Sequence, residues 1–220
     1  MTTVKICGMR SPDDALKSAA AGADMLGFVF ATVKRQVSLE AARAAIKAVK
    51  NLRPVNQPRF VGVFVNDSLE HIHHTADFAG LDIIQLSGDE GPDFVAAIRL
   101  PVIKAIRTGP GGIQQALEIT GIYVERVPGI TFVFYSTVPG RYGGTGTLGD
   151  LKAAANLARR YSTILAGGLT PQNVAEAIRS VSTLAVDVSS GVETNGNKDA
   201  DKITAFVRQA KGEEGLDEEG

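Results

Sequence analysis

Residues 162–193, STILAGGLTPQNVAEAIRSVSTLAVDVSSGVE, carry the pattern that decides the fold. Two apolar, strand-like runs, at 162–167 and 184–189, flank an amphipathic run at 170–181 that is typical of a helix. A glycine-rich turn follows the first strand, and a second glycine-containing turn follows the other. This order predicts parallel βα units with functional turns at the strand ends.

The same alternation of strands and helices continues along the rest of the chain. Strands are expected at 3–7, 25–30, 59–65, 81–86, 101–106, 130–135, 162–167 and 184–189. Several are apolar almost throughout, as strands covered on both faces should be. Helix patterns open with a hydroxyl N-cap, in two cases followed by proline: Ser11–Pro12, Ser38 and Thr170–Pro171. Eight such units predict a (β/α)8 barrel.

The predicted architecture is a single-domain α/β TIM barrel over residues 1–211, followed by an acidic, disordered tail at 212–220. A doubly wound sheet is the competing architecture. It normally has fewer strands, and its glycine fingerprint follows the first strand. Here the glycine-rich turns follow late strands, where barrels commonly bind phosphate. The barrel is therefore favoured.

Composition excludes several classes of partner. The chain has 220 residues and a formal net charge of -1, which argues against nucleic acid as a partner. No stretch approaches the roughly 20 apolar residues that span a bilayer, and the N-terminus has no signal-peptide layout. Cys7 is the only cysteine, so no disulfide can form within the chain and a reducing cytoplasm is expected. The composition does not separate a monomer from a homodimer.

Three side chains at predicted strand ends are candidates for chemistry. Cys7 ends the first strand and could act as a base or nucleophile, or be a buried, inert thiol; Lys5 shares its face. Asp187 interrupts an apolar strand, so it is either a hydrogen-bond organiser, the favoured role, or a ligand for a substrate hydroxyl. Arg35 follows the second strand and could hold a carboxylate bidentately, or be an ordinary loop arginine.

The two late turns predict a phosphate site. Gly167 and Gly168 follow one strand and Ser190 and Gly191 follow the next, and both turns precede predicted helix starts. Exposed backbone N–H groups at such positions favour phosphate, so a phosphorylated small molecule is the expected ligand. The histidines of EHIHH (70–74) have no acid or cysteine placed to complete a metal site, and we expect them on a solvated face.

Taken together, the motifs resemble the phosphoribosylanthranilate isomerase family of tryptophan biosynthesis. They run in family order from Val4 to Asp199: VKICGM, GFVF with a following KR, VGVFVN, IQLSGDE, GGTG, LAGGLTPQNV, VDVSSGVE and NGNKD. The resemblance implies an Amadori rearrangement of a phosphoribosyl amine without metal or cofactor. That reaction needs an acid to protonate the ribose ring oxygen and a base to remove the C2′ proton.

The resemblance also implies roles for particular residues. It makes Cys7 the general base and Arg35 the residue that binds the substrate carboxylate. It places the substrate phosphate at Gly167, Gly168, Ser190 and Gly191, and it includes Gly143 and Gly144 of GGTG in the substrate-binding loop. Asp187 matches an aspartate in the last strand of the family.

The general acid of the family does not carry over. Its members have an aspartate at the end of the sixth strand, where this chain has Tyr135 or, with a loop one residue shorter, Ser136. Losing a positioned acid costs about 10²–10⁴-fold in rate, and hydroxyls donate protons poorly near neutral pH. Asp89 and Asp150 are candidates to replace it from other loops. Besides a weakened isomerase, a non-catalytic phosphoribosyl binder and an enzyme acting on another phosphorylated sugar stay open.

Overall fold

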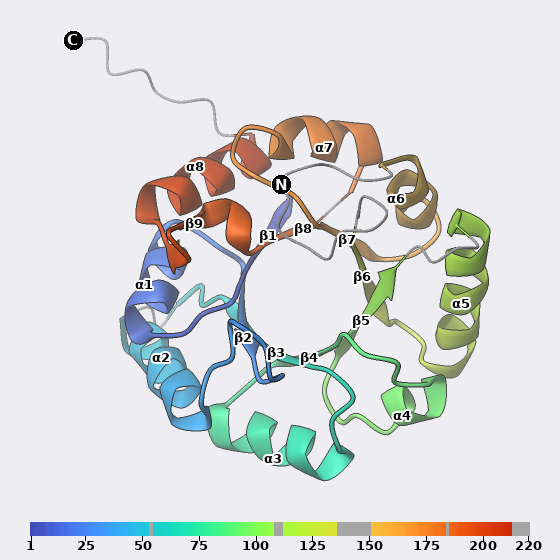
Figure 1. The fold of residues 1–220 in the computed structure, drawn as a ribbon, viewed down its shortest axis with the longest axis horizontal. Coiled ribbons are helices and arrows are strands. Elements are labelled where there is room, and N and C mark those ends of the chain that lie inside the picture. The colour runs from blue at the N-terminus through green and yellow to red at the C-terminus, as the bar shows by residue number, and fades with distance from the viewer. Residues whose placement is uncertain (53–54, 108–111, 136–150, 184, 213–220) are drawn as a thin grey trace.

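The computed structural model, which describes residues 1–52, 55–107, 112–135, 151–183 and 185–212, confirms the predicted barrel (Figure 1). Eight parallel strands, each paired with the next along the chain, close when the eighth pairs with the first. They are β1 (Thr3–Cys7), β2 (Met25–Val29), β3 (Arg59–Phe64), β4 (Ile83–Leu86), β5 (Val102–Arg107), β6 (Thr131–Tyr135), β7 (Thr163–Ala166) and β8 (Ala185–Val188). Every predicted strand is present, with small differences at its ends.

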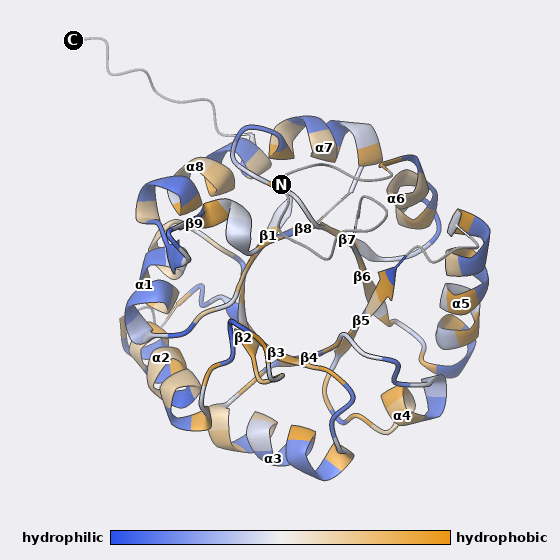
Figure 2. Cartoon of the chain, in the orientation of Figure 1, coloured by the Kyte–Doolittle hydropathy of each residue, from blue (hydrophilic) through white to orange (hydrophobic). Residues whose placement is uncertain are grey.

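Helices surround the barrel (Figure 1), and hydrophilic residues line the outer side of α1 and α8 (Figure 2). The α-helices are α1 (Pro12–Ala20), α2 (Leu39–Leu52), α3 (Leu69–Ala79), α4 (Pro92–Ala96), α5 (Gly112–Arg126), α6 (Leu151–Ala158), α7 (Val174–Val181) and α8 (Ala200–Lys211). A short 3-10 helix, η1 (Ser190–Val192), and a hairpin of β9 (Glu193–Thr194) and β10 (Asn197–Lys198) lie between β8 and α8. Within the described residues, no helix is long and apolar enough to cross a membrane.

Two of the three predicted helix starts are confirmed. The Ser11 hydroxyl accepts a bond from the Asp14 amide at the start of α1, and the Ser38 hydroxyl accepts one from the Ala41 amide at the start of α2. The predicted start at Thr170 is wrong.

Helix α7 begins only at Val174, because the residues before it form a separate turn. The Asn173 side chain accepts a bond from the Thr170 amide (2.8 Å) and donates one to the Gly168 carbonyl (3.0 Å). An asparagine that bonds nearby backbone in this way favours a turn over a helix. The carbonyl end of β7 is therefore separated from the helix that follows it.

The barrel interior changes character along the strands. Its apolar cluster contains Met25, Val61, Ile83, Ile103, Ala105, Val133, Ile164 and Ala166. Two residues further along β4, β6 and β8, the inward positions carry Gln85, Tyr135 and Asp187 instead, since alternate residues of a strand share a face. The carboxyl ends of the strands therefore carry polar side chains above the apolar cluster.

Candidate active site

A cavity of about 590 Å³ opens at the C-terminal ends of β1, β6, β7 and β8. It gathers most of the site residues that the sequence predicts: Cys7, Arg35, Tyr135, Gly167, Gly168, Asp187, Ser190 and Gly191. Lys34, Ser189, Glu193 and Gly196 also line it. Ser136, Gly143, Gly144 and Asp150 lie outside the described residues. We call this cavity the rim pocket.

Cys7 lies buried on the barrel wall of the rim pocket. Gly27 on β2 leaves room for it, because a Cβ there would lie 2.8 Å from the Cys7 sulfur. The Ser189 hydroxyl donates to the Cys7 carbonyl at 3.0 Å, joining β1 to the end of β8. Burial raises the pKa of the Cys7 thiol, and the Lys5 ammonium partly opposes that rise. Once deprotonated, this thiol is a strong, desolvated base.

Lys5 and Asp187 form an ion pair inside the barrel. The Lys5 nitrogen lies 3.0 Å from a carboxylate oxygen of Asp187 on the neighbouring strand, and the two side chains are 0% and 6% exposed. Burial alone would lower the pKa of Lys5, but the negative charge of Asp187 and smaller contributions from Cys7 and Tyr135 together outweigh burial, and the pKa is raised. Asp187 therefore pairs with the buried Lys5 ammonium beneath the rim pocket. The Asp187 side chain also lines the pocket itself.

Tyr135 ends β6 and points its hydroxyl into a polar cluster. The Gln85 amide nitrogen donates to the Tyr135 hydroxyl at 3.1 Å and to the Ser87 hydroxyl at 3.2 Å. The Arg107 guanidinium lies 5.8 Å from the centre of the Tyr135 ring. Burial, with a smaller contribution from the Asp187 carboxylate, raises the pKa of Tyr135 to about 12. The phenol therefore stays protonated at neutral pH and can donate a hydrogen bond.

Arg35 reaches the rim pocket, but part of its hydrogen-bonding capacity is already used. Its Nε and Nη2 donate to the two carboxylate oxygens of Glu193 at 2.8 and 2.9 Å. Lys198 donates to the same carboxylate at 3.0 Å. Sequence reasoning missed Glu193 and Lys198, although both stand in quoted motifs, because nothing local links them to a residue near position 35.

The two glycine turns meet at the far side of the rim pocket. Gly167 and Gly168 have φ values of 93° and 67°, which non-glycine residues rarely adopt. A Cβ on Gly191 would collide with the Leu169 carbonyl oxygen, so the turns pack backbone against backbone. The prediction that these turns lead into helices needs correction, since α7 starts later and Ser190 opens only a three-residue 3-10 helix. The amides available to an anion are therefore loop amides.

Two other predicted features lie away from the rim pocket. Asp89, a candidate replacement acid, is exposed and bonded to Asn66 through its amide (2.7 Å) and its carboxylate (3.3 Å). It does not line the pocket. His71 pairs with Asp67 at 2.7 Å, and in the described part of the chain no three ligating side chains could share a metal ion.

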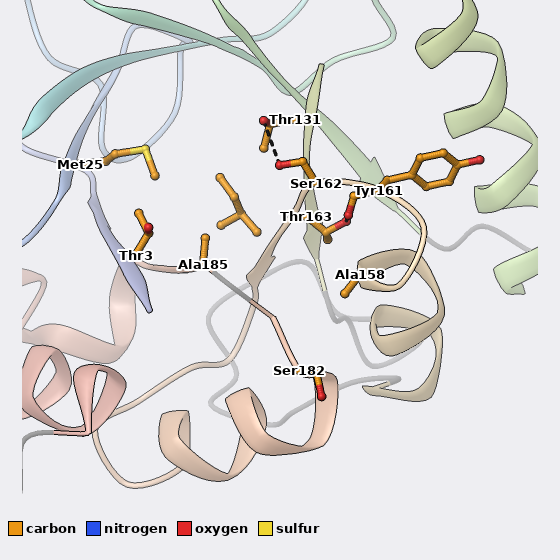
Figure 3. Close-up of a pocket in the computed structure, with 10 residues that line it drawn as sticks. Thr3, Met25, Thr131, Ala158, Tyr161, Ser162, Thr163, Ser182 and Ala185 are labelled. Carbon is orange, nitrogen blue, oxygen red and sulfur yellow. Dashed lines mark hydrogen bonds between the residues drawn. The ribbon is translucent and has the colours of Figure 1, made fainter. Parts of the chain in front are cut away.

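A second, smaller cavity of about 250 Å³ lies at the opposite end of the barrel (Figure 3). It is lined by first residues of strands, among them Thr3, Met25, Thr131 and Ala185. Among the described residues that line it, only Tyr161 carries an ionisable group, and the bond drawn between the Thr131 and Ser162 hydroxyls spans 3.3 Å (Figure 3). Since active sites of barrels lie at the C-terminal strand ends, the rim pocket is the candidate site.

Fold and pocket together define a (β/α)8-barrel protein of the enzyme class, with a polar site at the C-terminal ends of its strands. Residues 4–209 match the family model described as N-(5'phosphoribosyl)anthranilate (PRA) isomerase. The chain belongs to this family.

Individual relatives agree with the family match. The N-(5'-phosphoribosyl)anthranilate isomerase of Roseiflexus castenholzii is 45% identical over 212 residues, which cover 94% of this chain and 97% of the relative. The crystal structure of phosphoribosyl anthranilate isomerase from Thermotoga maritima superposes with a TM-score of 0.82 at 37% identity, covering 96% of this chain and all of that one. An isomerase complexed with reduced 1-(o-carboxyphenylamino)-1-deoxyribulose 5-phosphate has a TM-score of 0.79 at 35% identity, with coverage of 96% and 100%.

Proposed function

We propose that the protein converts N-(5'-phosphoribosyl)anthranilate into 1-(2-carboxyphenylamino)-1-deoxyribulose 5-phosphate, an Amadori rearrangement in tryptophan biosynthesis. Family membership supports the reaction. The observation that carries it is the rim pocket, where one cavity holds a buried thiol, an arginine and two glycine turns. These groups suit a base, a carboxylate ligand and a phosphate site.

The proposed chemistry needs only a proton donor and a proton acceptor from the protein. A donor protonates the ribose ring oxygen as the C1′–O bond breaks, and the Cys7 thiolate then removes the C2′ proton to give the enol-amine. Tyr135 or Ser136 stands where the family has its acid. A phenol with a pKa of about 12 stabilises the departing oxygen through a hydrogen bond better than it transfers a proton. We therefore propose a working but slowed ring-opening step.

Substrate binding is divided between the two sides of the rim pocket. We assign the anthranilate carboxylate to Arg35, and the phosphate to the backbone amides of the two turns at Gly167–Gly168 and Ser190–Gly191. By the resemblance of GGTG to the family motif, we also assign Gly143 and Gly144 to the substrate-binding loop. Asp187 has a supporting role, because its ion pair with Lys5 already occupies one of its oxygens.

The proposal includes a cytoplasmic location and excludes nucleic acid as a partner. A single cysteine suits a reducing compartment, and a net charge of -1 offers no general attraction for phosphodiester backbones.

A second candidate function is the binding of phosphoribosyl compounds without turnover. The absence of a carboxylic acid at Tyr135 favours it, because the rest of the pocket can bind a ligand without that acid. Such a protein would keep affinity for a product analogue and lose the rearrangement.

Turnover and binding by the purified protein separate the candidates. We expect measurable isomerisation of phosphoribosylanthranilate, rescue of a bacterial strain that lacks the isomerase, and calorimetric binding of the reduced product analogue. Binding without turnover or rescue would instead support the non-catalytic binder. Neither binding nor turnover would reject both, and a panel of other phosphorylated sugars would then be tested.

A further inference from the structure

The guanidinium of Arg35 is held along one edge, and among the residues that the structure describes no hydrogen-bond partner occupies its other edge, which can therefore take a ligand. A guanidinium has five N–H donors in a planar fork. Glu193 takes one from Nε and one from Nη2, at 2.8 and 2.9 Å, so about three remain on Nη1 and Nη2. Both Arg35 and Glu193 line the rim pocket. The unused edge is therefore fixed in orientation before any ligand binds.

Glu193 is fixed by two lysines. Lys198, whose side chain is 1% exposed, donates to the Glu193 carboxylate at 3.0 Å and to the Ser189 carbonyl at 2.9 Å. Lys202 donates to the Glu193 carbonyl at 3.0 Å. Burial opposes ionisation, yet Arg35 and Lys198 together lower the pKa of Glu193, which is therefore an anion at neutral pH.

The hairpin that carries Glu193 is also fixed in place. Asn195 and Gly196 join β9 to β10 with positive φ values of 52° and 80°, as a tight Asn-Gly turn requires. Arg10 donates to the Gly196 carbonyl at 2.6 Å and to the Asn197 side chain at 3.1 Å. The loop after β1 therefore holds the hairpin over the rim pocket.

The stem of Arg35 lies in a slot that only glycine leaves open. A Cβ on Gly8 would lie 2.8 Å from Cδ of Arg35, and the Gly8 φ of 89° already disfavours other residues. An arginine side chain ordinarily loses more conformational entropy than most side chains when it is ordered. In this chain Gly8 and Glu193 impose that order in advance of binding.

We propose that Glu193 is a positioning residue that aims the free edge of Arg35 and so makes the rim pocket selective for an aromatic amine bearing a carboxylate. The inference rests on the proposed role of Arg35. Arg35, Lys198 and Glu193 together leave one net positive charge, and Lys34 on the pocket wall adds to it. An anionic substrate is therefore still attracted beside Glu193, and a fixed fork binds its planar carboxylate bidentately.

The test compares two ligands. One is the reduced product analogue with its carboxylate, and the other is the same phosphorylated compound built from aniline. Calorimetry at one salt concentration gives, for each variant, the dissociation constant of the aniline compound divided by that of the product analogue. We expect a ratio well above tenfold for the wild type, a fall of about tenfold with Glu193→Ala, and a smaller fall with Glu193→Gln. The affinity for the aniline compound should stay within about twofold of wild type.

A double-mutant cycle shows whether Glu193 acts through Arg35. In an Arg35→Ala background, where the ratio should approach one, Glu193→Ala should have no further effect on it. Glu90→Gln is the matched control, because Glu90 also pairs with a buried lysine, Lys104, at 3.0 Å but does not line the rim pocket. Its ratio should equal that of the wild type.

Three results would overturn the inference. The first is a ratio that Glu193→Ala leaves unchanged or raises, which would mean that Glu193 competes with the substrate. The second is an equal effect of Glu193→Ala with and without Arg35. The third is loss of affinity for both ligands alike, which would show a structural role only. A wild-type protein that binds neither ligand would refute the proposed function itself, and the inference with it.

Discussion

The ammonium of Lys5 and the carboxylate of Asp187 face each other at 3.0 Å across β1 and β8, beneath the rim pocket. A buried pair of this kind stabilises little against a hydrophobic pair, but a single buried charge without its partner costs about 3–5 kcal/mol. Asp187→Asn should therefore lower the free energy of unfolding by about that amount in denaturant titration.

The double variant Lys5→Met with Asp187→Leu is the control for this pair. It should recover most of the lost stability, because neither charge is left alone. The raised pKa of Lys5 means that the contribution of the pair is complete below the unfolded value of 10.5 and is lost as pH rises through the higher folded value. Equal stability of Asp187→Asn and wild type at pH 7 would show that the pair is not a charged one.

Replacing Cys7 tests the base. Cys7→Ser keeps the size of the side chain but removes a group that can ionise, so we expect kcat to fall by about 10²–10⁴-fold with KM little changed. Steady-state kinetics, followed through the fluorescence of the product, give both kcat and KM. Wild-type turnover in Cys7→Ser would remove Cys7 from the mechanism.

The pH profile tests the same assignment without a mutation. The thiolate is the active form, and burial raises the pKa of Cys7 above its ordinary value of 9.0. In the free enzyme kcat/KM should therefore increase with pH across the neutral range and up to at least pH 9. A profile that is flat above pH 7 would contradict this.

Tyr135 is the residue where an acid can be restored. Tyr135→Asp should raise kcat by about 10²-fold, since burial and, to a smaller extent, the Asp187 carboxylate raise the pKa of Tyr135 and would also keep a new aspartate protonated. Tyr135→Phe should lower kcat by removing the hydrogen bond to the departing oxygen. Ser136→Asp tests the alternative alignment. A gain from Ser136→Asp alone would move the acid position to residue 136.

Gly191 tests the phosphate site. Gly191→Ala places a methyl group against the Leu169 carbonyl oxygen, so the two turns must separate. We expect affinity for the product analogue to fall by at least about tenfold in calorimetry.

Gly121→Ala is the control for that substitution, because its nearest neighbour would lie 3.9 Å away, at the Tyr161 hydroxyl, within helix α5. It should leave affinity unchanged and stabilise the protein by about 0.5–1 kcal/mol. Unchanged affinity in Gly191→Ala as well would place the phosphate elsewhere.

Hydrophobic periodicity alone predicts the barrel, because it is a local property of each strand and helix. The same pattern places Cys7 and Tyr135 at strand ends, since the last residue of a parallel strand reaches the same edge whatever its neighbours are. The N-cap pattern correctly predicted the helix starts at Ser11 and Ser38. It misled at Thr170, where the side chain of Asn173 closes a turn before the helix.

Which side chains meet in the rim pocket depends on the closed barrel and cannot be read from local patterns. Arg35 and Glu193 are 158 residues apart and Tyr135 and Gln85 are 50 apart, so no pattern within a strand or helix connects them. They come together because the barrel closes and because each strand has a particular register with its neighbours. The periodicity of a chain specifies its elements, but contacts between distant strand ends depend on the closed sheet.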